Sequence, residues 1–540
     1  MKFTDFDLKQ IDDTALEALS PSQLLSLSRR LLTDLKKARE QLNQNPGNSS
    51  RPSGSMPPWE CGSKEEDSGD SEDDEPEPAP GTDEDGIGEA SVAGTDAPAD
   101  SASTATPDAK KQTPASSTLP EKKRPGKQRG APGFGRTQQL PVTATEHHKS
   151  AFCVVCESSL AGANHVAWTS WDCIDVAEPV PGKPGILLTN TRHVVFQADC
   201  PCGHCNRVEP FRSTPDAAWP GVSIGEWRLV GPRFAAMIVL LSKRHRNSVR
   251  LIRELLHDFL GIELSVGTIS KTIREAGRSV APLEEELVRE LEKASLVYAD
   301  ETSWKESGSL LWLWVFRTLT MAYFVVGKRD RTLITKLLLT GRFKGTVMSD
   351  GWIVYRECPD RLRCWAHLIR KARGLSESYT TVVSETGMAI LTALTAFQDA
   401  IYAAREQPGQ QPGALMARYR DELEHLKALC VAYQESRHEK LQAFVRELLN
   451  DWDTIFRQLQ DPTLPLTNNE AERSLRHWVI ERRLSHGTRT PEGTRSLTLL
   501  ASVIETCRIR GAPLWDYLTR VIAAARKGLQ IPCLPAVQAG

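Results

Sequence analysis

The stretch from residue 46 to residue 120 constrains the fold of this 540-residue chain more than any other part. It consists mainly of Pro, Gly, Ser, Thr, Ala and acidic residues, with almost no large apolar side chains. Because such a segment buries too little apolar surface to offset the entropy of ordering its backbone, we expect a disordered acidic linker. Folded parts then lie on either side of it, and a chain of this length predicts about three or four domains.

The formal net charge of −2 hides an uneven distribution of charge. Residues 60–100 hold 16 Asp and Glu against one Lys, so the rest of the chain carries about +13. A basic remainder suits a polyanionic partner, although any single basic run can equally be a solvated face. The acidic part could mimic DNA and compete for that basic surface, or serve as a plain solvated linker.

A Gly-rich basic arm follows the linker at residues 121–149. Lys127 and Arg129 belong to it and could track a phosphate backbone without reading base sequence. At the other end of the linker, residues 1–45 predict a helix over 20–45, with Ser20 as N-cap and Gln23 closing a capping box. Its leucines at heptad a and d positions favour either a short coiled coil or an amphipathic helix packed on its own domain: Leu24, Leu31, Leu35 and Leu42.

Neither end of the chain nor its interior predicts a membrane protein. No apolar run reaches the roughly 18 residues of a membrane span. The amino terminus also lacks the basic-then-apolar pattern of a signal peptide. We therefore expect a cytoplasmic, reduced protein, whose 12 cysteines are metal ligands or core residues rather than disulfides.

Two Cys-x-x-Cys pairs within residues 150–212 predict a zinc-binding domain. The proposed ligands are Cys153, Cys156, Cys202 and Cys205, since two such pairs on short turns make a tetrahedral thiolate site. A β-like run at 193–196 precedes the second pair. Other assignments stay open, because Cys200 offers a Cys-x-Cys register, His204 could replace a cysteine, Cys173 could join the set, and all could be scattered core thiols.

Residues 213–294 predict a helical region with a helix-turn-helix shape. One apolar stripe begins at Val249 and ends at Gly261, and Ser265 then caps a second helix that carries Lys271 and Arg274. Helix-turn-helix shapes are common in all-helical packing, so DNA reading and plain packing both fit this unit.

Two aspartates each end an apolar, β-like run. Asp300 follows 296–299 and Asp350 follows 346–349. Between them lie two aromatic-rich runs, at 310–316 and 322–326, and then a helix-like stretch. Two hairpin-linked strands, a crossover and a further strand are typical of the start of a ribonuclease H-like sheet, which would place the two carboxylates close together. Glu301 should point to the opposite face, as surface charge or in a local salt bridge.

A third carboxylate comes from the helix that begins near Asn468. About 120 residues separate Asp350 from Glu472, and residues 376–460 within that gap predict a helical insertion. Glu470 and Glu472 are about 200° apart on a helix, so only one can face the aspartates. Two strand-end aspartates and a helix-borne glutamate are ligands suited to Mg²⁺ or Mn²⁺ in two-metal-ion phosphoryl transfer.

In these blocks the chain resembles the DDE transposases of the IS-sixty-six insertion-sequence family, over nearly its whole length. The similar blocks are Asn48 to Ser53, Asp300-Glu301-Thr302, Ser349-Asp350-Gly351-Trp352, Cys364-Trp365-Ala366-His367, and Asn468 to Arg473. The last is similar to the family's Asn-Asn-x-Ala-Glu-Arg block, whose glutamate falls at Glu472.

The resemblance implies a multidomain α+β protein with a ribonuclease H-like catalytic core at 295–375 and 461–525 and a C-terminal tail at 526–540. It implies an enzyme that binds insertion-sequence ends, cuts DNA to free a 3′-hydroxyl, and joins that hydroxyl to target DNA at Asp300, Asp350 and Glu472. Partners would be end and target DNA, a second copy or higher multimer, and accessory proteins encoded by the element. The protein would be bacterial and nucleoid-associated.

The remaining site residues have competing interpretations. Arg473, Arg476, Arg482 and Arg483 could bind DNA phosphates, with Arg473 the best candidate, although a structural salt bridge would also explain it. His367 and Trp365 could line the site or be buried. Asn468 and Asn469 should cap the helix rather than touch DNA. The rival functions are a non-catalytic DNA-binding relative, regulatory or domesticated, and a nuclease that hydrolyses DNA without joining strands.

Overall fold

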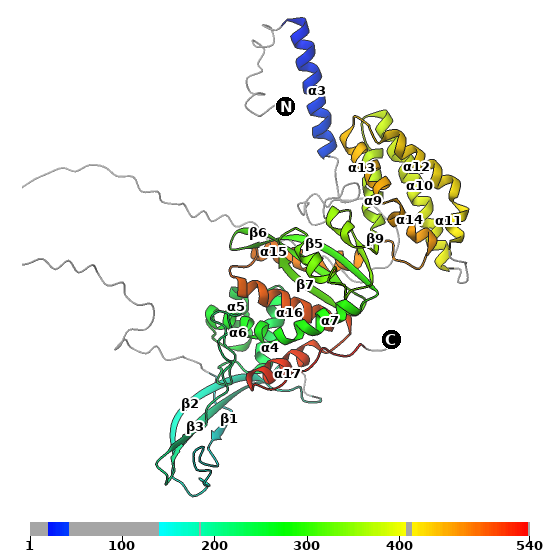
Figure 1. The fold of residues 1–540 in the computed structure, drawn as a ribbon. Coiled ribbons are helices and arrows are strands. Elements are labelled where there is room, and N and C mark those ends of the chain that lie inside the picture. The colour runs from blue at the N-terminus through cyan, green and yellow to red at the C-terminus, as the bar shows by residue number, and fades with distance from the viewer. Residues whose placement is uncertain (1–19, 43–139, 183–184, 407–412, 538–540) are drawn as a thin grey trace, which may run out of the picture. The chain divides into compact units, whose positions relative to one another are not determined.

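The fold was examined in a computed structural model, which describes residues 20–42, 140–182, 185–406 and 413–537 (Figure 1). The predicted acidic linker, the motif at 48–53, and Lys127 and Arg129 of the basic arm lie outside these residues.

The N-terminal helix α3 spans Pro21–Leu42. Its predicted capping box is present: the backbone N–H of Ser20 donates to Gln23 Oε1 at 2.9 Å, and that of Gln23 donates to Ser20 Oγ at 3.4 Å. Leu35 of the predicted heptad seam is exposed. The coiled coil stays a prediction, because a single chain tests no partner helix.

The cysteine-bearing lobe is a four-stranded sheet in the order β1-β3-β2, with β4 paired to β3. Its strands are β1 (Ala144–His148), β2 (His165–Val176), β3 (Leu188–Asp199) and β4 (Cys205–Arg207). Strand β1 runs parallel to β3, and the other pairs are antiparallel. Residues 144–148, which the sequence assigned to the basic arm, therefore belong to this sheet.

The helical region that follows has the predicted helix-turn-helix outline. It contains α4 (Pro232–Lys243), α5 (Val249–Leu260), α6 (Val266–Ser279), the 3₁₀ turn η3 (Ala281–Leu283) and α7 (Glu284–Lys293). Gly261 ends α5 in the left-handed conformation, and the Ser265 hydroxyl accepts the backbone N–H of Thr268 at 3.1 Å, as expected. The second half of α6 is largely buried, so that half is a packing helix.

A five-stranded mixed sheet forms the centre of the second half of the chain, in the order β7-β6-β5-β8-β9. Its elements are β5 (Leu296–Glu306), β6 (Ser309–Arg317), β7 (Ala322–Gly327), α8 (Thr332–Leu337), β8 (Thr346–Ser349), the 3₁₀ turn η4 (Ile353–Glu357) and β9 (Arg361–Arg363). Strands β5, β6 and β7 form an antiparallel meander, and β8 and β9 run parallel to β5. The predicted order of two hairpin-linked strands, a crossover helix and a parallel strand is thus present.

Six helices, which come between β9 and α15 in the chain, form a bundle with its own apolar core (Figure 1). They are α9 (Trp365–Ser376), α10 (Thr381–Glu406), α11 (Ala414–Arg418), α12 (Arg420–Tyr433), α13 (Glu439–Asn450) and α14 (Trp452–Gln460). By length and composition alone α10 could cross a membrane, contrary to the expectation that no segment would. It buries Ile390, Leu394 and Phe397 in the bundle, which indicates a core helix.

A buried ion network ties this bundle to the sheet. Arg363 at the end of β9 contacts both Asp451 and Glu447, and Arg361 donates to Asp451 Oδ1 at 2.6 Å. Lys371 donates to Glu447 at 2.7 Å. Charges surrounding these two carboxylates outweigh burial and lower the pKa of each. The bundle is therefore fixed to the strand beside β8.

The chain then returns to the sheet through α15 (Asn469–Ser485), α16 (Pro491–Ile509) and α17 (Leu514–Arg526). Leu475 and Trp478 of α15 pack in one apolar cluster with Tyr298 and Trp304 of β5. Helix α16 lies along β7, where its Ser502 hydroxyl accepts the backbone N–H of Phe324 at 2.9 Å. The predicted tail is partly packed: the backbone N–H of Leu534, which is buried, donates to the carboxylate of Glu286.

Candidate functional site

Asp300 and Asp350 lie at the same level of two neighbouring parallel strands. The register pairs Val297 with Val347 and Tyr298 with Met348, and continuing it places Asp300 beside Asp350. Asp350 directly follows β8, as predicted. Asp300 does not end a strand, because β5 continues to Glu306 in its hairpin with β6. Only the pairing of β5 with β8 ends near Asp300. Asp300 and Asp350 therefore lie at the same end of this pair of strands.

The helix that carries Glu472 begins against β5. The side-chain amide of Asn468, fully buried, donates to the carbonyl of Ala299 at 2.9 Å. Its backbone N–H faces Cys364 Sγ at 3.2 Å. Asn468 occupies the N-cap position but its side chain makes no capping bond, and Asn469 is already the first helical residue and exposed. The expected capping role is therefore wrong: Asn468 joins α15 to the strand of Asp300.

The two glutamates of α15 point to different partners. Glu470 accepts from Arg317 at 3.2 Å and lies 3.8 Å from Arg473. Glu472 lies 3.7 Å from His367 Nδ1 and 3.9 Å from Arg370. Of these two glutamates, Glu472 is the one that raises the pKa of Asp300, after burial, Glu301 and Asp350.

Burial is the largest cause that raises the pKa of Asp300 well above its usual range, followed by repulsion from Glu301, Asp350 and Glu472. The backbone N–H of Glu301 donates to Asp300 Oδ1 at 2.9 Å and opposes this shift only in part. On the neighbouring strand, the backbone N–H of Trp352 donates to Asp350 Oδ1 at 2.9 Å. Three neighbouring carboxylates therefore act together with burial to disfavour the charged form of Asp300.

Glu301 is in the local salt bridge that the sequence predicted, but it is not surface charge. Its side chain is 1% exposed and accepts from Arg329 at 2.8 Å and from the Tyr355 hydroxyl at 2.8 Å. The Arg329 guanidinium lies over the rings of Trp312 and Trp352, 4.3 and 4.7 Å from their centroids. Burial and Asp350 raise the pKa of Glu301 to about 7. The contacts of Glu301 with Arg329 and Tyr355, and of Arg329 with Trp352, therefore stabilise the backbone next to Asp350.

His367 reaches the site and Trp365 does not. Cys364, His367 and Glu472 bring one ligand atom each within 4.8 Å of one another. Trp365, two residues earlier on the same helix, is fully buried and donates its indole N–H to the carbonyl of Ile455 at 2.9 Å. The expectation that Trp365 could line the site is therefore wrong, because its ring belongs to the core of the helical bundle.

The residues fit a divalent cation in two respects. Mutual repulsion of the carboxylates would be relieved by positive charge, and oxygen ligands suit Mg²⁺ and Mn²⁺. Glu472 Oε1 and His367 Nδ1 are buried with no hydrogen-bond partner, so the glutamate has an uncommitted ligand atom. Among the described residues, the set of ligand atoms within 4.8 Å of one another that contains Glu472 also contains Cys364 and His367. It contains neither Asp300 nor Asp350.

The four predicted DNA-binding arginines of α15 fall into two classes. Arg473, Arg476 and Arg483 are exposed, as a phosphate contact requires. Arg482 instead donates to Thr302 Oγ1 at 2.9 Å and to the Ser303 carbonyl at 2.6 Å. Its guanidinium is occupied in holding α15 to β5, so we no longer assign it to phosphate.

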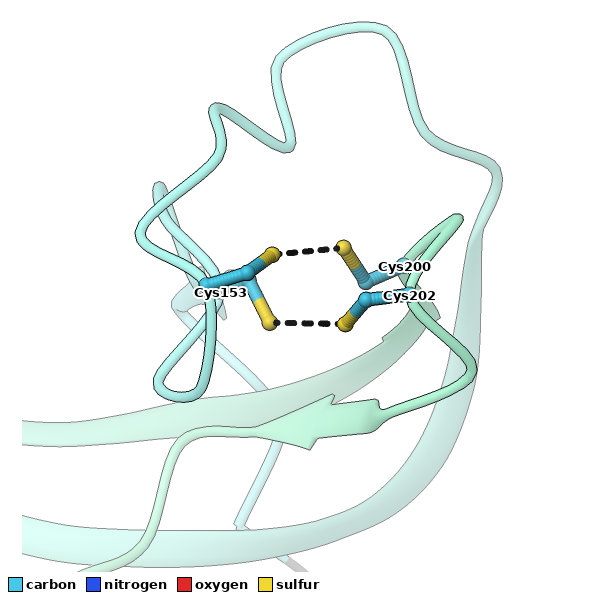
Figure 2. Close-up of side chains that lie close together, drawn as sticks. Cys153, Cys200 and Cys202 are labelled. Atoms are coloured by element: carbon cyan, nitrogen blue, oxygen red, sulfur yellow. Dashed lines mark hydrogen bonds between the residues drawn. The ribbon is translucent and has the colours of Figure 1, made fainter.

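Four thiols converge on the cysteine-bearing lobe. Figure 2 shows Cys153, Cys200 and Cys202 turned toward one another. The Sγ of Cys153 lies 3.7 Å from that of Cys202, and the Sγ of Cys156 lies 3.4 Å from that of Cys200. Four sulfurs at about 2.3 Å from a tetrahedral zinc ion would be about 3.8 Å apart. A backbone hydrogen bond from Cys156 helps to lower the pKa of Cys153 to about 6, which favours the ligating thiolate.

The second pair of ligands differs from the prediction, since the set contains Cys200 in place of Cys205. The reason is the β3–β4 hairpin, whose register places Cys205 opposite Asp199 inside the ladder. Cys200 and Cys202 lie on the turn itself, where Gly203 has a φ of 87°. The Cys-x-Cys register is therefore the one used, and among the described residues neither His204 nor Cys173 belongs to the set.

Comparisons with known proteins agree with the motifs. Residues 228–496 match the transposase IS66 family. Two proteins of Sinorhizobium fredii (strain NBRC 101917 / NGR234) are similar to this chain. "Uncharacterized protein y4qI" is 22% identical over 301 residues, which cover 50% of this chain and 54% of that protein. "Uncharacterized protein y4jO" is 24% identical over 155 residues, 29% of this chain and 46% of that protein.

The chain thus spans about half the length of the curated relatives it matches. The family match covers the strand of Asp300, the end of β8, the helical bundle and all of α15. Through residues 228–496, this chain belongs to the transposase IS66 family and carries its DDE transposase domain.

Proposed function

We propose that this protein binds insertion-sequence ends and catalyses DNA cleavage and strand transfer, with Asp300, Asp350 and Glu472 as the catalytic carboxylates. The proposal is supported by the β5–β8 register, which continues to Asp300 and Asp350, and by the repulsion that Asp350 and Glu472 both exert on Asp300. The sheet order β7-β6-β5-β8-β9 supports a ribonuclease H-like catalytic fold, in which the central parallel pair presents the aspartates.

Asp300, Asp350 and Glu472 would hold Mg²⁺ or Mn²⁺. Bound at such a site, divalent ions polarise the phosphate and activate the attacking hydroxyl or water. The protein's own side chains have separate tasks. Asn468 fixes the start of α15 to β5, and the Trp352 backbone N–H orients the Asp350 carboxylate. His367 and Arg370 of α9 lie 3.7 and 3.9 Å from the Glu472 carboxylate and supply positive charge or a polar neighbour there.

DNA contacts are proposed for the exposed Arg473, Arg476 and Arg483, which share a helix with Glu472. Lys127 and Arg129 of the basic arm would add contacts to the phosphate backbone. The cysteine set Cys153, Cys156, Cys200 and Cys202 would hold a structural zinc ion. We further propose a homodimer or higher multimer, assisted by accessory proteins of the element, in the bacterial cytoplasm at the nucleoid.

A strand-transfer assay with the full chain tests the proposal. Labelled element ends, target DNA and Mg²⁺ should give joined products with the wild type and none with Asp350→Ala. Glu470→Gln is the control, because it removes a carboxylate two residues from Glu472 on α15, but from a side chain paired with Arg317. Cleavage without joining would indicate a nuclease. Binding without either product would favour the non-catalytic alternative, and full activity of Asp350→Ala would contradict the assignment of Asp350.

A further inference from the structure

We propose that Glu146, His148 and His193 form a second transition-metal site, separate from the cysteine set, between β1 and β3. Their carboxylate and imidazole ligand atoms all lie within 4.8 Å of one another. No local sequence pattern predicts this group, because 45 residues separate His148 from His193.

Strand pairing places the three side chains on one surface. Glu146 pairs with His193 in the parallel β1–β3 ladder. His148 is two residues beyond Glu146, so both project from the same face of β1. His148 Nε2 is 3.0 Å from His193 Nδ1, and Glu146 Oε2 is 3.3 Å from the same nitrogen.

One nitrogen therefore faces two ligand atoms at once. A protonated His193 Nδ1 can donate well to only one of the two atoms, His148 Nε2 or Glu146 Oε2. An unprotonated Nδ1 repels the Glu146 carboxylate. A cation between the three atoms satisfies all of them. Nitrogen and oxygen ligands at about 2.0–2.1 Å from a tetrahedral zinc ion are about 3.3 Å apart, close to the spacing that this group already has.

Stacked aromatic rings hold the two imidazoles in place. Trp171, which pairs with His193 across the β2–β3 ladder, stacks on it with centroids 4.5 Å apart and planes 13° apart. The same indole stacks on His148 at 5.5 Å and 20°, and its ring also stacks with Trp227 at 4.7 Å. Orientation of the ligands is thus fixed before binding, which lowers the entropy cost of capturing an ion.

The ligand set selects the class of ion. Two imidazoles and one carboxylate suit zinc and neighbouring transition metals, whereas Mg²⁺ prefers oxygen ligands only. Three protein ligands leave one position for water or another ligand. The carboxylate of Glu146 is 61% exposed and His193 is 17% exposed, so an ion can enter from solvent. Binding would clamp the end of β1 to the centre of the sheet.

Zinc content of the untagged full chain tests the proposal without any DNA reaction. After equilibration with Zn²⁺ and removal of free metal, the wild type should hold two zinc ions per chain. The double variant His148→Ala/His193→Ala should hold one, and Cys153→Ser/Cys156→Ser should lose the other. His147→Ala is the matched control, because this exposed histidine is next in sequence but projects from the opposite face of β1.

A single zinc ion in the wild type, or a second ion that survives loss of both histidines, would overturn the proposal. Cobalt titration of the wild type gives a readout that needs no variant. Cobalt in the cysteine set should show strong thiolate charge-transfer absorption. A second equivalent should add only weak visible bands, and binding that always brings thiolate absorption would contradict a histidine site.

Discussion

The buried side-chain amide of Asn468 donates to the carbonyl of Ala299 and so joins the helix of Glu472 to the strand of Asp300. The two residues are 169 positions apart in sequence. Ala299 directly precedes Asp300, and Asn468 directly precedes helix α15. This hydrogen bond therefore holds the start of the Glu472 helix against the strand of Asp300.

Replacing Asn468 with Ala should lower both stability and DNA cleavage. The Ala299 carbonyl would be left buried without this donor, at a cost of about 1–3 kcal/mol. Asn469→Ala changes the exposed neighbour and should leave both properties unchanged. Thermal unfolding and cleavage of labelled ends measure the two effects. Equal behaviour of the two variants would show that the Asn468 bond does not set the site.

Asp300→Asn should stabilise the protein at neutral pH in magnesium-free buffer. The pKa of Asp300 is higher in the folded than in the unfolded chain, so its charge opposes folding once the pH exceeds the usual aspartate range, about 4. The difference between variant and wild type should therefore grow as pH rises and shrink in acid. About 1 kcal/mol corresponds to about 2–4 °C in melting temperature for a domain of this size. A lower melting temperature for Asp300→Asn at pH 8 would contradict the repulsion.

Arg329→Ala should be strongly destabilising. It removes the cation between the Trp312 and Trp352 rings and leaves the carboxylate of Glu301 buried with only Tyr355 as a side-chain partner. Loss of a charged partner from a buried acceptor costs about 3 kcal/mol. Arg331→Ala is the control, because this side chain is 74% exposed and lies 3.8 Å from Glu357. In denaturant unfolding, the free energies of unfolding of the two variants should differ by most of that amount. A difference below about 1 kcal/mol would contradict a stabilising role for the Arg329 contacts.

Cys200→Ser should lose the zinc of the cysteine set, and Cys205→Ser should keep it. The two residues flank the same hairpin, but only Cys200 lies in the four-thiol group. Zinc analysis of both variants, in a His148→Ala/His193→Ala background, isolates this centre. Loss of zinc from Cys205→Ser but not from Cys200→Ser would instead assign the ligands to the Cys-x-x-Cys pair Cys202 and Cys205.

Arg363→Met should cost about 3–5 kcal/mol at neutral pH, because it leaves the carboxylates of Asp451 and Glu447 buried without their shared cation. The pKa values of both carboxyls are lowered in the folded chain, so the network stabilises above the usual carboxyl range and this stability is lost as pH falls. The defect should therefore narrow in acid. Arg446→Met, which breaks an exposed pair between Glu435 and the residue next to Glu447 on α13, should cost less than about 1 kcal/mol.

Local sequence pattern was enough for the capped helices and for the order of the central sheet. Ser20 and Ser265 correctly predicted the starts of their helices, because a capping interaction involves residues only a few positions apart. Apolar runs likewise predicted β6 and β7, since strands buried on both faces leave few polar interruptions.

Relationships between distant residues could not be predicted in this way. The choice of Cys200 over Cys205 depends on where the β3–β4 ladder stops, which a spacing rule ignores. The continuation of β5 past Asp300 depends on β6 and not on β5 alone. Asn468 was predicted as a helix cap, because its partner Ala299 lies 169 residues away. No local pattern singled out Arg329, whose partner Glu301 lies 28 residues away.

The position of the helical bundle also has a consequence during synthesis. Both aspartates leave the ribosome before the six helices, and Glu472 leaves only after them. A nascent chain that stops within the bundle therefore has two of the three carboxylates and no α15 to complete the set. If the three carboxylates cut DNA as proposed, chains that end before Glu472 lack one of them, so the order of the segments delays that activity until translation has passed α15.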